Sequence, residues 1–323
     1  MRNLRERVGT VIKTMSNIHR PGDSPDIYLF ATPRGGSTWL MELIWSQPGL
    51  KYCSEPLNIR NPRVEQCLGL HSWAQLYSAA ASEHYQRYFS QIAAGQIRFL
   101  NPNPFRRHSR LWTNRIVFKI IHAGHDRMEL FEQRLGGRIL YVLRHPIAVG
   151  LSREVLPMLD DFLVSELRDA FSAEQVRLAE KIIGGGSQLE RGVLAWCLQN
   201  AIPLKNLRPS WLVVTYEQLI VQPEVVIEQI CRRLDLPQPQ RMLRALAIPS
   251  AVIGKSDAAT QELLKKSARG TGRERLIEKW RDRVSDREEA ELMDILSVFG
   301  LDIYRQGSHL PDERFFLSAT DTS

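Results

Sequence analysis

Short apolar runs alternate with amphipathic stretches along the chain, and this alternation predicts strands that alternate with helices. The apolar runs predict strands over 26–31, 51–54, 115–121, 138–143 and 211–215. Apolar positions at helical spacing predict helices over 37–47, 72–94, 126–135, 146–155, 173–183, 187–201, 223–234 and 286–299. Such alternation is typical of a mostly parallel sheet covered by helices on both faces, so we expect an α/β fold.

The turn after the first predicted strand has the chemistry of an anion site. It reads Thr-Pro-Arg-Gly-Gly-Ser-Thr-Trp, and the next predicted helix begins within it. Gly35 and Gly36 let the backbone approach an anion closely, and the N–H groups of a helix N-terminus attract negative charge. Arg34, Ser37 and Thr38 add donors at the same point. The turn therefore predicts a bound anion, of the kind that a phosphate group provides.

This turn matches neither of the common nucleotide-binding loops. The Walker pattern G-x-x-x-x-G-K-[ST] requires a lysine directly before the hydroxyl residue, and glycine stands there instead. The dinucleotide pattern G-x-G-x-x-G is also absent. A P-loop-like kinase-type protein and a non-catalytic binding module remain as alternatives.

A second arginine ends another predicted strand. Arg144 follows the strand 138–143, and Pro146 stands at the start of the next predicted helix. Ser152 lies about two helical turns further on, so Arg144 and Ser152 together are candidates for a second phosphate. Two anion sites at successive strand ends suit a nucleotide phosphorylated at two positions.

Both motifs, in this order, resemble those of the sulfotransferases that use 3′-phosphoadenosine-5′-phosphosulfate (PAPS). The turn P-R-G-G-S-T-W is similar to the family's 5′-phosphosulfate loop, and the Arg144 segment is similar to its 3′-phosphate motif. The resemblance implies a P-loop-like sheet and a PAPS site without a metal. The implied PAPS residues are Arg34, Gly35, Gly36, Ser37, Thr38, Trp39, Arg144, Ser152, Tyr216, Arg269 and Gly270. Among them, Trp39 and Tyr216 are expected near the adenine, and Arg269 and Gly270 in a lid over the 3′-phosphate.

Two residues are candidates for the base that sulfuryl transfer to a hydroxyl requires. Glu55, in Ser-Glu-Pro-Leu-Asn, resembles the catalytic glutamate of carbohydrate sulfotransferases. His122 resembles the catalytic histidine of cytosolic sulfotransferases that act on phenols and steroids. We favour Glu55, because the stretch from the first loop to this motif is close to the carbohydrate class. Arg34 and Lys119 are the candidate cations for the leaving phosphate, since a lysine within an apolar strand needs an anionic partner.

Composition agrees with one enzyme domain. The chain has 323 residues, 43% of them hydrophobic, which we divide into a basic segment 1–25 and a domain 26–323. A net charge of +7 suits an anionic ligand, and without a zinc-finger or ribonucleoprotein motif we expect no nucleic-acid partner. The four cysteines form no C-x-x-C pair, and neither a secretory signal nor a membrane span is visible. We therefore expect a cytoplasmic protein, with peripheral membrane contact left open.

The acceptor is the least determined part of the prediction. Segments 56–114 and 156–210 lie outside the resemblance, and we expect them to form a helical acceptor-binding cap. With Glu55 as base, the resemblance implies a carbohydrate or glycolipid acceptor; with His122, it implies a small alcohol, phenol or lipid. The basic residues at 106–110 are open to contact with substrate or with solvent alone.

Overall fold

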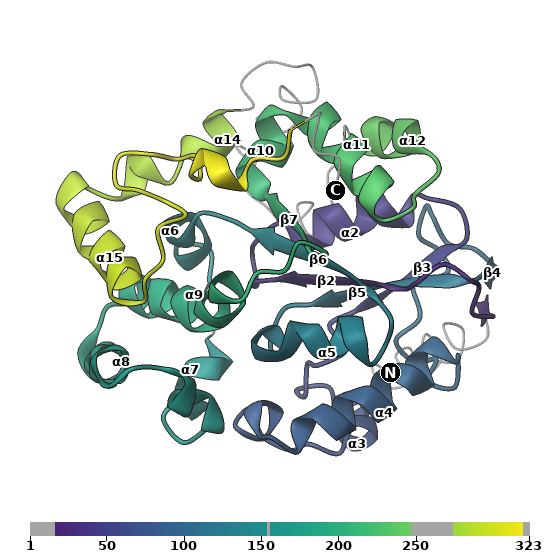
Figure 1. Ribbon diagram of the computed structural model, residues 1–323, viewed down its shortest axis with the longest axis horizontal. Coiled ribbons are helices and arrows are strands. Elements are labelled where there is room, and N and C mark those ends of the chain that lie inside the picture. The colour runs from purple at the N-terminus through teal and green to yellow at the C-terminus, as the bar shows by residue number, and fades with distance from the viewer. Residues whose placement is uncertain (1–16, 154–155, 247–273, 319–323) are drawn as a thin grey trace, which may run out of the picture.

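A parallel five-stranded sheet forms the centre of the molecule (Figure 1). The computed structural model describes residues 17–153, 156–246 and 274–318. In spatial order the strands are β3 (Leu50–Ser54), β5 (Arg115–Ile120), β2 (Ile27–Ala31), β6 (Arg138–Leu143) and β7 (Leu212–Thr215). Every neighbouring pair in this sheet is parallel, and each strand agrees with its predicted range to within one residue. The predicted α/β fold is confirmed.

Alternating side chains on the central strand β2 divide the core between the two faces of the sheet. Ile27, Leu29 and Ala31 belong to one hydrophobic cluster, and Tyr28 and Phe30 belong to the other. The first cluster is covered by α2 (Ser37–Trp45), α11 (Pro223–Arg233) and α12 (Pro239–Leu246). The second is covered by α3 (Pro62–Leu68), α4 (Ala81–Ala93), α5 (Met128–Gln133) and α9 (Gln188–Lys205). Because both faces are buried, most positions of the strands are apolar.

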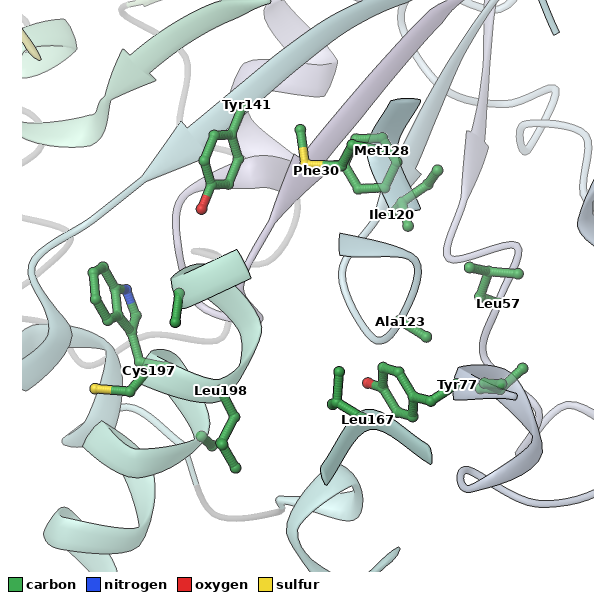
Figure 2. Packing of buried hydrophobic residues seen from close by; sticks show 14 of the residues in the cluster. Phe30, Leu57, Tyr77, Ile120, Ala123, Met128, Tyr141, Leu167, Cys197 and Leu198 are labelled. Carbon is green, nitrogen blue, oxygen red and sulfur yellow. The ribbon is translucent and has the colours of Figure 1, made fainter. Parts of the chain in front are cut away.

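The two segments outside the resemblance are bonded to each other. The Ala74 N–H donates to Asp161 Oδ2 at 3.1 Å, and the Ala79 N–H donates to Glu166 Oε2 at 2.7 Å. These contacts join the region of η1 (Gln75–Tyr77) to α7 (Pro157–Phe162) and η3 (Glu166–Ala170). Figure 2 shows side chains of both segments within the second cluster, beneath the sheet residue Phe30. A helical cap is thus present, and its role in acceptor binding stays a prediction.

Three predicted helices have different bounds in the structure. The prediction of a helix from residue 72 was wrong, because Ser72 and Ser78 bond to the backbone of Gln75 and close turns there; α4 begins at Ala81. The helix expected over 146–155 is α6 (Pro146–Gly150), and that expected over 126–135 is η2 (His125–Arg127) followed by α5. The helices α8 (Ala173–Gly185), α9, α11 and α15 (Asp286–Val298) lie near their predicted positions.

Several short helices and strands of the structure were not predicted from the sequence. Residues of the N-terminal segment pair with the chain before β5, where β1 (Ile18–His19) runs parallel to β4 (Trp112–Thr113). The division of the chain at residue 26 remains a prediction. The remaining short elements are α10 (Tyr216–Val221), α14 (Arg275–Glu278), η5 (Arg281–Arg283) and η6 (Glu313–Phe315). Among the described helices, none is long and apolar enough to cross a bilayer.

Candidate active site

The turn between β2 and α2 presents an uncapped helix N-terminus. Gly36 is the N-cap of α2 and has a φ of 87°, a left-handed conformation that glycine adopts without strain. No side chain caps the helix, and its first turn contains no acidic residue. Arg34 also has a positive φ, 71°, which costs a residue with a Cβ of order 1 kcal/mol. The backbone is therefore held in a shape that leaves N–H groups available to an anion.

Arg144 brings the second predicted motif against this turn. Its Nη1 donates to the Arg34 carbonyl at 2.9 Å, and its guanidinium lies 4.3 Å from the centre of the Tyr216 ring. The same tyrosine covers Gly36, where an added Cβ would lie only 2.5 Å from Tyr216 Cδ2. Trp39 meets Tyr216 edge to face at 6.2 Å. The structure thus gathers three of the predicted nucleotide-binding side chains, those of Arg144, Tyr216 and Trp39, around one glycine.

The structure does not bring every predicted nucleotide-binding residue into this group of side chains. Ser152 lies in the turn after α6 and donates its hydroxyl to the Ala148 carbonyl at 2.9 Å, so it does not engage Arg144. Gly35 continues the anion turn, where its N–H donates to the Thr32 carbonyl at 3.0 Å. Arg269 and Gly270, predicted for the lid, lie outside the described residues.

The candidate catalytic residues form one cluster at the ends of β3 and β5. Lys119 Nζ donates to Glu55 Oε1 at 2.9 Å and to Thr38 Oγ1 at 3.1 Å. His122 Nε2 lies 3.4 Å from Glu55 Oε2, and Asn58 Nδ2 donates to the same oxygen at 3.2 Å. Since the Glu55 N–H also donates to the Lys119 carbonyl, the ladder between the two strands fixes this arrangement. A single ammonium group therefore connects the anion turn to the carboxylate.

The environment of Glu55 strongly favours its ionised form. The hydrogen bond with His122, aided by the charge of Lys119, holds the pKa of Glu55 well below its usual range, although burial acts in the opposite direction. The Lys119 side chain is only 5% exposed, so its charge is screened little by water. Glu55 itself has a φ of 57°, an unusual conformation for a residue with a Cβ. Backbone strain of this kind is common where a side chain must be aimed at a site.

The family model for the sulfotransferase domain matches residues 24–295. The chain belongs to the sulfotransferase family. It is therefore a transferase, and the kinase-type and non-catalytic alternatives are set aside. No curated protein matches the sequence.

The solved structures that are similar to this sulfotransferase include three other sulfotransferases. The sulfotransferase domain from the curacin biosynthetic pathway is 18% identical, with a TM-score of 0.44, over 88% of this chain and 99% of that one. The sulfotransferase domain from the Synechococcus PCC 7002 olefin synthase is 16% identical, with a TM-score of 0.42, over 90% and 98%. Sulfotransferase STF9 from Mycobacterium avium is 11% identical, with a TM-score of 0.37, over 76% and 71%.

Sequence reasoning missed several residues that support the site of this sulfotransferase. Asn58 binds the candidate base, and its place three residues after Glu55 was the signal for it. The Tyr77 hydroxyl donates to the His122 carbonyl at 3.0 Å. This contact joins segments that are distant in the sequence, and no motif predicts it. Buried Glu217 accepts from the His145 N–H at 2.9 Å and so braces the chain directly after Arg144.

Proposed function

We propose that this sulfotransferase moves the sulfuryl group of PAPS to a hydroxyl of a carbohydrate or glycolipid, with Glu55 as the base. The observation that carries the proposal is the path from Thr38 through Lys119 to Glu55, which links the anion turn to a carboxylate by two hydrogen bonds. The acceptor class rests on the resemblance of the Ser-Glu-Pro-Leu-Asn stretch to carbohydrate sulfotransferases.

The residues present fit a donor that is phosphorylated at both its 5′ and 3′ ends. Arg34, Gly35, Gly36, Ser37 and Thr38 would hold the 5′-phosphosulfate at the N-terminus of α2. Buried Thr32 Oγ1 in the same turn has no hydrogen-bond partner among the described residues and is available to the ligand. For the 3′-phosphate we propose Arg144 and Ser152, with Trp39 and Tyr216 against the adenine. We also propose that Arg269 and Gly270 close over the nucleotide.

The donor supplies a sulfuryl group bound to a good leaving group, a phosphate. Glu55 accepts the proton of the acceptor hydroxyl, whose oxygen forms a new bond to sulfur while the bond from sulfur to the phosphate oxygen breaks. Arg34 and Lys119 stabilise the charge that then develops on the phosphate. A carboxylate with a lowered pKa is a weak base. Lys119, however, bonds both Glu55 and Thr38 of the anion turn. When its ammonium turns toward the phosphate, Glu55 loses one of the groups that lower its pKa and becomes a stronger base.

One observation favours a second candidate, in which His122 is the base and the acceptor is a small alcohol, phenol or lipid. Glu55 is strongly held in its ionised form and contacts His122 Nε2, as a carboxylate that orients a histidine would. The two candidates differ in which substitution abolishes proton transfer, and the variants described in the Discussion separate them.

The nucleotide assignment is tested by thermal shift. We expect 3′-phosphoadenosine-5′-phosphate (PAP), the product left by PAPS, to stabilise the protein more than ATP does at equal concentration. Preferential stabilisation by ATP would contradict the proposal. Transfer of labelled sulfate to a panel of sugars, glycolipids, alcohols and phenols then identifies the acceptor class.

A further inference from the structure

A buried cation that no described carboxylate neutralises lies next to the candidate active site. Arg153 follows Ser152 and is only 6% exposed, and its Nε and Nη1 atoms are shielded from solvent without a hydrogen-bond partner. Among the described residues, no carboxylate lies within ion-pair distance of it. Burial lowers the pKa of Arg153 to about 10, so the side chain remains charged at neutral pH. An unpaired buried charge is strongly unfavourable, which indicates that the site is completed by an anion.

A neighbouring arginine shows that this fold can satisfy a buried guanidinium fully. Arg127 pairs with Asp126 at 2.6 Å and donates to the carbonyls of Tyr77 and Ser78 and to the hydroxyl of Ser82. Arg127 is thus held for structural reasons. Arg153 lacks every contact of this kind among the described residues, so packing alone does not account for it.

The position of Arg153 points to the acceptor side of the site. Tyr77 and His125 are the groups with which its charge interacts. Tyr77, which belongs to the cap, lies beneath Ala123 in Figure 2 and donates its hydroxyl to the His122 carbonyl, and the His122 ring contacts the candidate base. Arg144 has different neighbours, since it donates to the Arg34 carbonyl of the anion turn and lies against Tyr216.

The charge of this position distinguishes between classes of anion. Burial lowers the pKa of His125 to about 4, so this histidine is neutral at physiological pH and adds no positive charge. The single charge of Arg153 therefore matches a singly charged carboxylate better than a doubly charged phosphate. A guanidinium and a carboxylate also match in shape, because two parallel hydrogen bonds can form between them.

We propose that Arg153 binds a carboxylate of the acceptor, and that this sulfotransferase therefore acts on hydroxy acids, including sugars that carry a carboxylate. The inference rests on the proposed function and narrows its acceptor class. The hydroxyl to be sulfated lies toward Glu55 and His122, and the carboxylate lies behind them.

The first test needs no acceptor. Arg153→Met removes the unpaired charge and retains much of the volume, so the melting temperature of the free protein should stay unchanged or rise by about 2 °C. Arg127→Met is the matched control and should lower it by several degrees, because Asp126 is left buried without its partner. A fall for Arg153→Met as large as that for Arg127→Met would overturn the proposal, because it would show that Arg153 is already satisfied in the free protein.

The second test uses pairs of acceptors that differ only in charge. Labelled-sulfate transfer is measured with glucuronate, 3-hydroxybutyrate and the methyl ester of each. The wild type should prefer the acids by at least about tenfold in kcat/KM, the usual effect of one charged hydrogen bond. Arg153→Met should lose this preference, Arg153→Lys should retain part of it, and both should bind PAP as the wild type does.

The outcomes distinguish a failure of the role of Arg153 from a failure of the proposed PAPS-dependent function. Equal rates for acids and esters, or transfer to the esters alone, would refute the role of Arg153. Weaker PAP binding by Arg153→Met would also refute it, since the arginine would then serve the 3′-phosphate of the donor. Failure of the proposed function would appear differently, as wild-type protein that PAP does not stabilise.

Discussion

Replacement of Glu55 by glutamine tests the assignment of the base most directly. Glutamine keeps the length and shape of the side chain, and its carbonyl oxygen can still accept from Lys119, so the cluster should remain assembled. What the variant loses is the ability to take a proton. We expect the turnover number to fall by about 10²–10⁴, the usual loss on removal of a general base. At 1.36 kcal/mol for each factor of ten, this corresponds to roughly 2.7–5.4 kcal/mol of transition-state stabilisation.

The structure predicts that the variant still folds but is less stable than the wild type. The Glu55 side chain is 31% exposed, but its partner Lys119 is only 5% exposed, and a buried ammonium that keeps only a neutral acceptor destabilises the folded state. Transfer of labelled sulfate is the assay, with PAP binding measured in parallel to show that the nucleotide site is intact. Glu65→Gln is the matched control, because Glu65 also contacts a histidine, His71, at 3.1 Å, but at an exposed position.

Turnover near that of the wild type in Glu55→Gln would refute Glu55 as the base and move this role to His122. His122→Gln should then cause the larger loss. A wild-type rate that falls between pH 7 and pH 5 would point the same way, because imidazoles titrate in that range and a carboxylate with a strongly lowered pKa does not.

Three further predictions concern the nucleotide, the leaving group and acid stability. Gly36→Ala should abolish PAP binding and lower stability, because the added Cβ would clash with Tyr216. Gly136→Ala is the control, because Gly136 also has a positive φ but its Cβ would enter open space, so PAP binding should be unchanged. Thermal shift with PAP measures both variants. Lys119→Met should lower turnover by about 10²-fold or more while PAP still binds; unchanged turnover in the sulfate-transfer assay would contradict its role. Burial lowers the pKa of His145 from 6.5 to about 3. The contribution of the neutral imidazole to the stability of the folded state is therefore complete above pH 6.5 and is lost as the pH falls toward 3. In His145→Phe the melting temperature should fall less steeply with acid than in the wild type, and an equal slope would contradict this.

The sheet was predictable because its strands are buried on both faces. A strand in such a sheet is apolar at most positions on both faces, and runs such as 139–143 stand out from their polar flanks. The region before α4 was harder, because residues 72–80 contain apolar positions at a spacing that suits a helix. Serine side chains decide the local structure there, and their hydrogen bonds to the backbone become visible only in the fold.

The two arginines could be placed in advance because each follows a strand, and the carboxyl ends of parallel strands lie at one edge of a sheet. The order of the strands could not be predicted. β3 pairs with β5, which follows it by some sixty residues in the chain, and this pairing brings Glu55 to Lys119. Spacing in the sequence gave no indication of the contact. That no carboxylate in the described part of the chain pairs with Arg153 is likewise a property of packing, since charged residues are plentiful in the sequence.

The same strand order changes the question about the base. From the sequence, Glu55 and His122 were alternatives, because each resembled the catalytic residue of a different class. In the structure they contact each other, and the hydrogen bond with His122 lowers the pKa of Glu55. Removal of the carboxylate leaves the histidine without an orienting partner, and removal of the histidine takes away the strongest influence on the carboxylate. Losses at the two positions therefore should not add, and the proton of the acceptor is best assigned by comparing both single variants across pH.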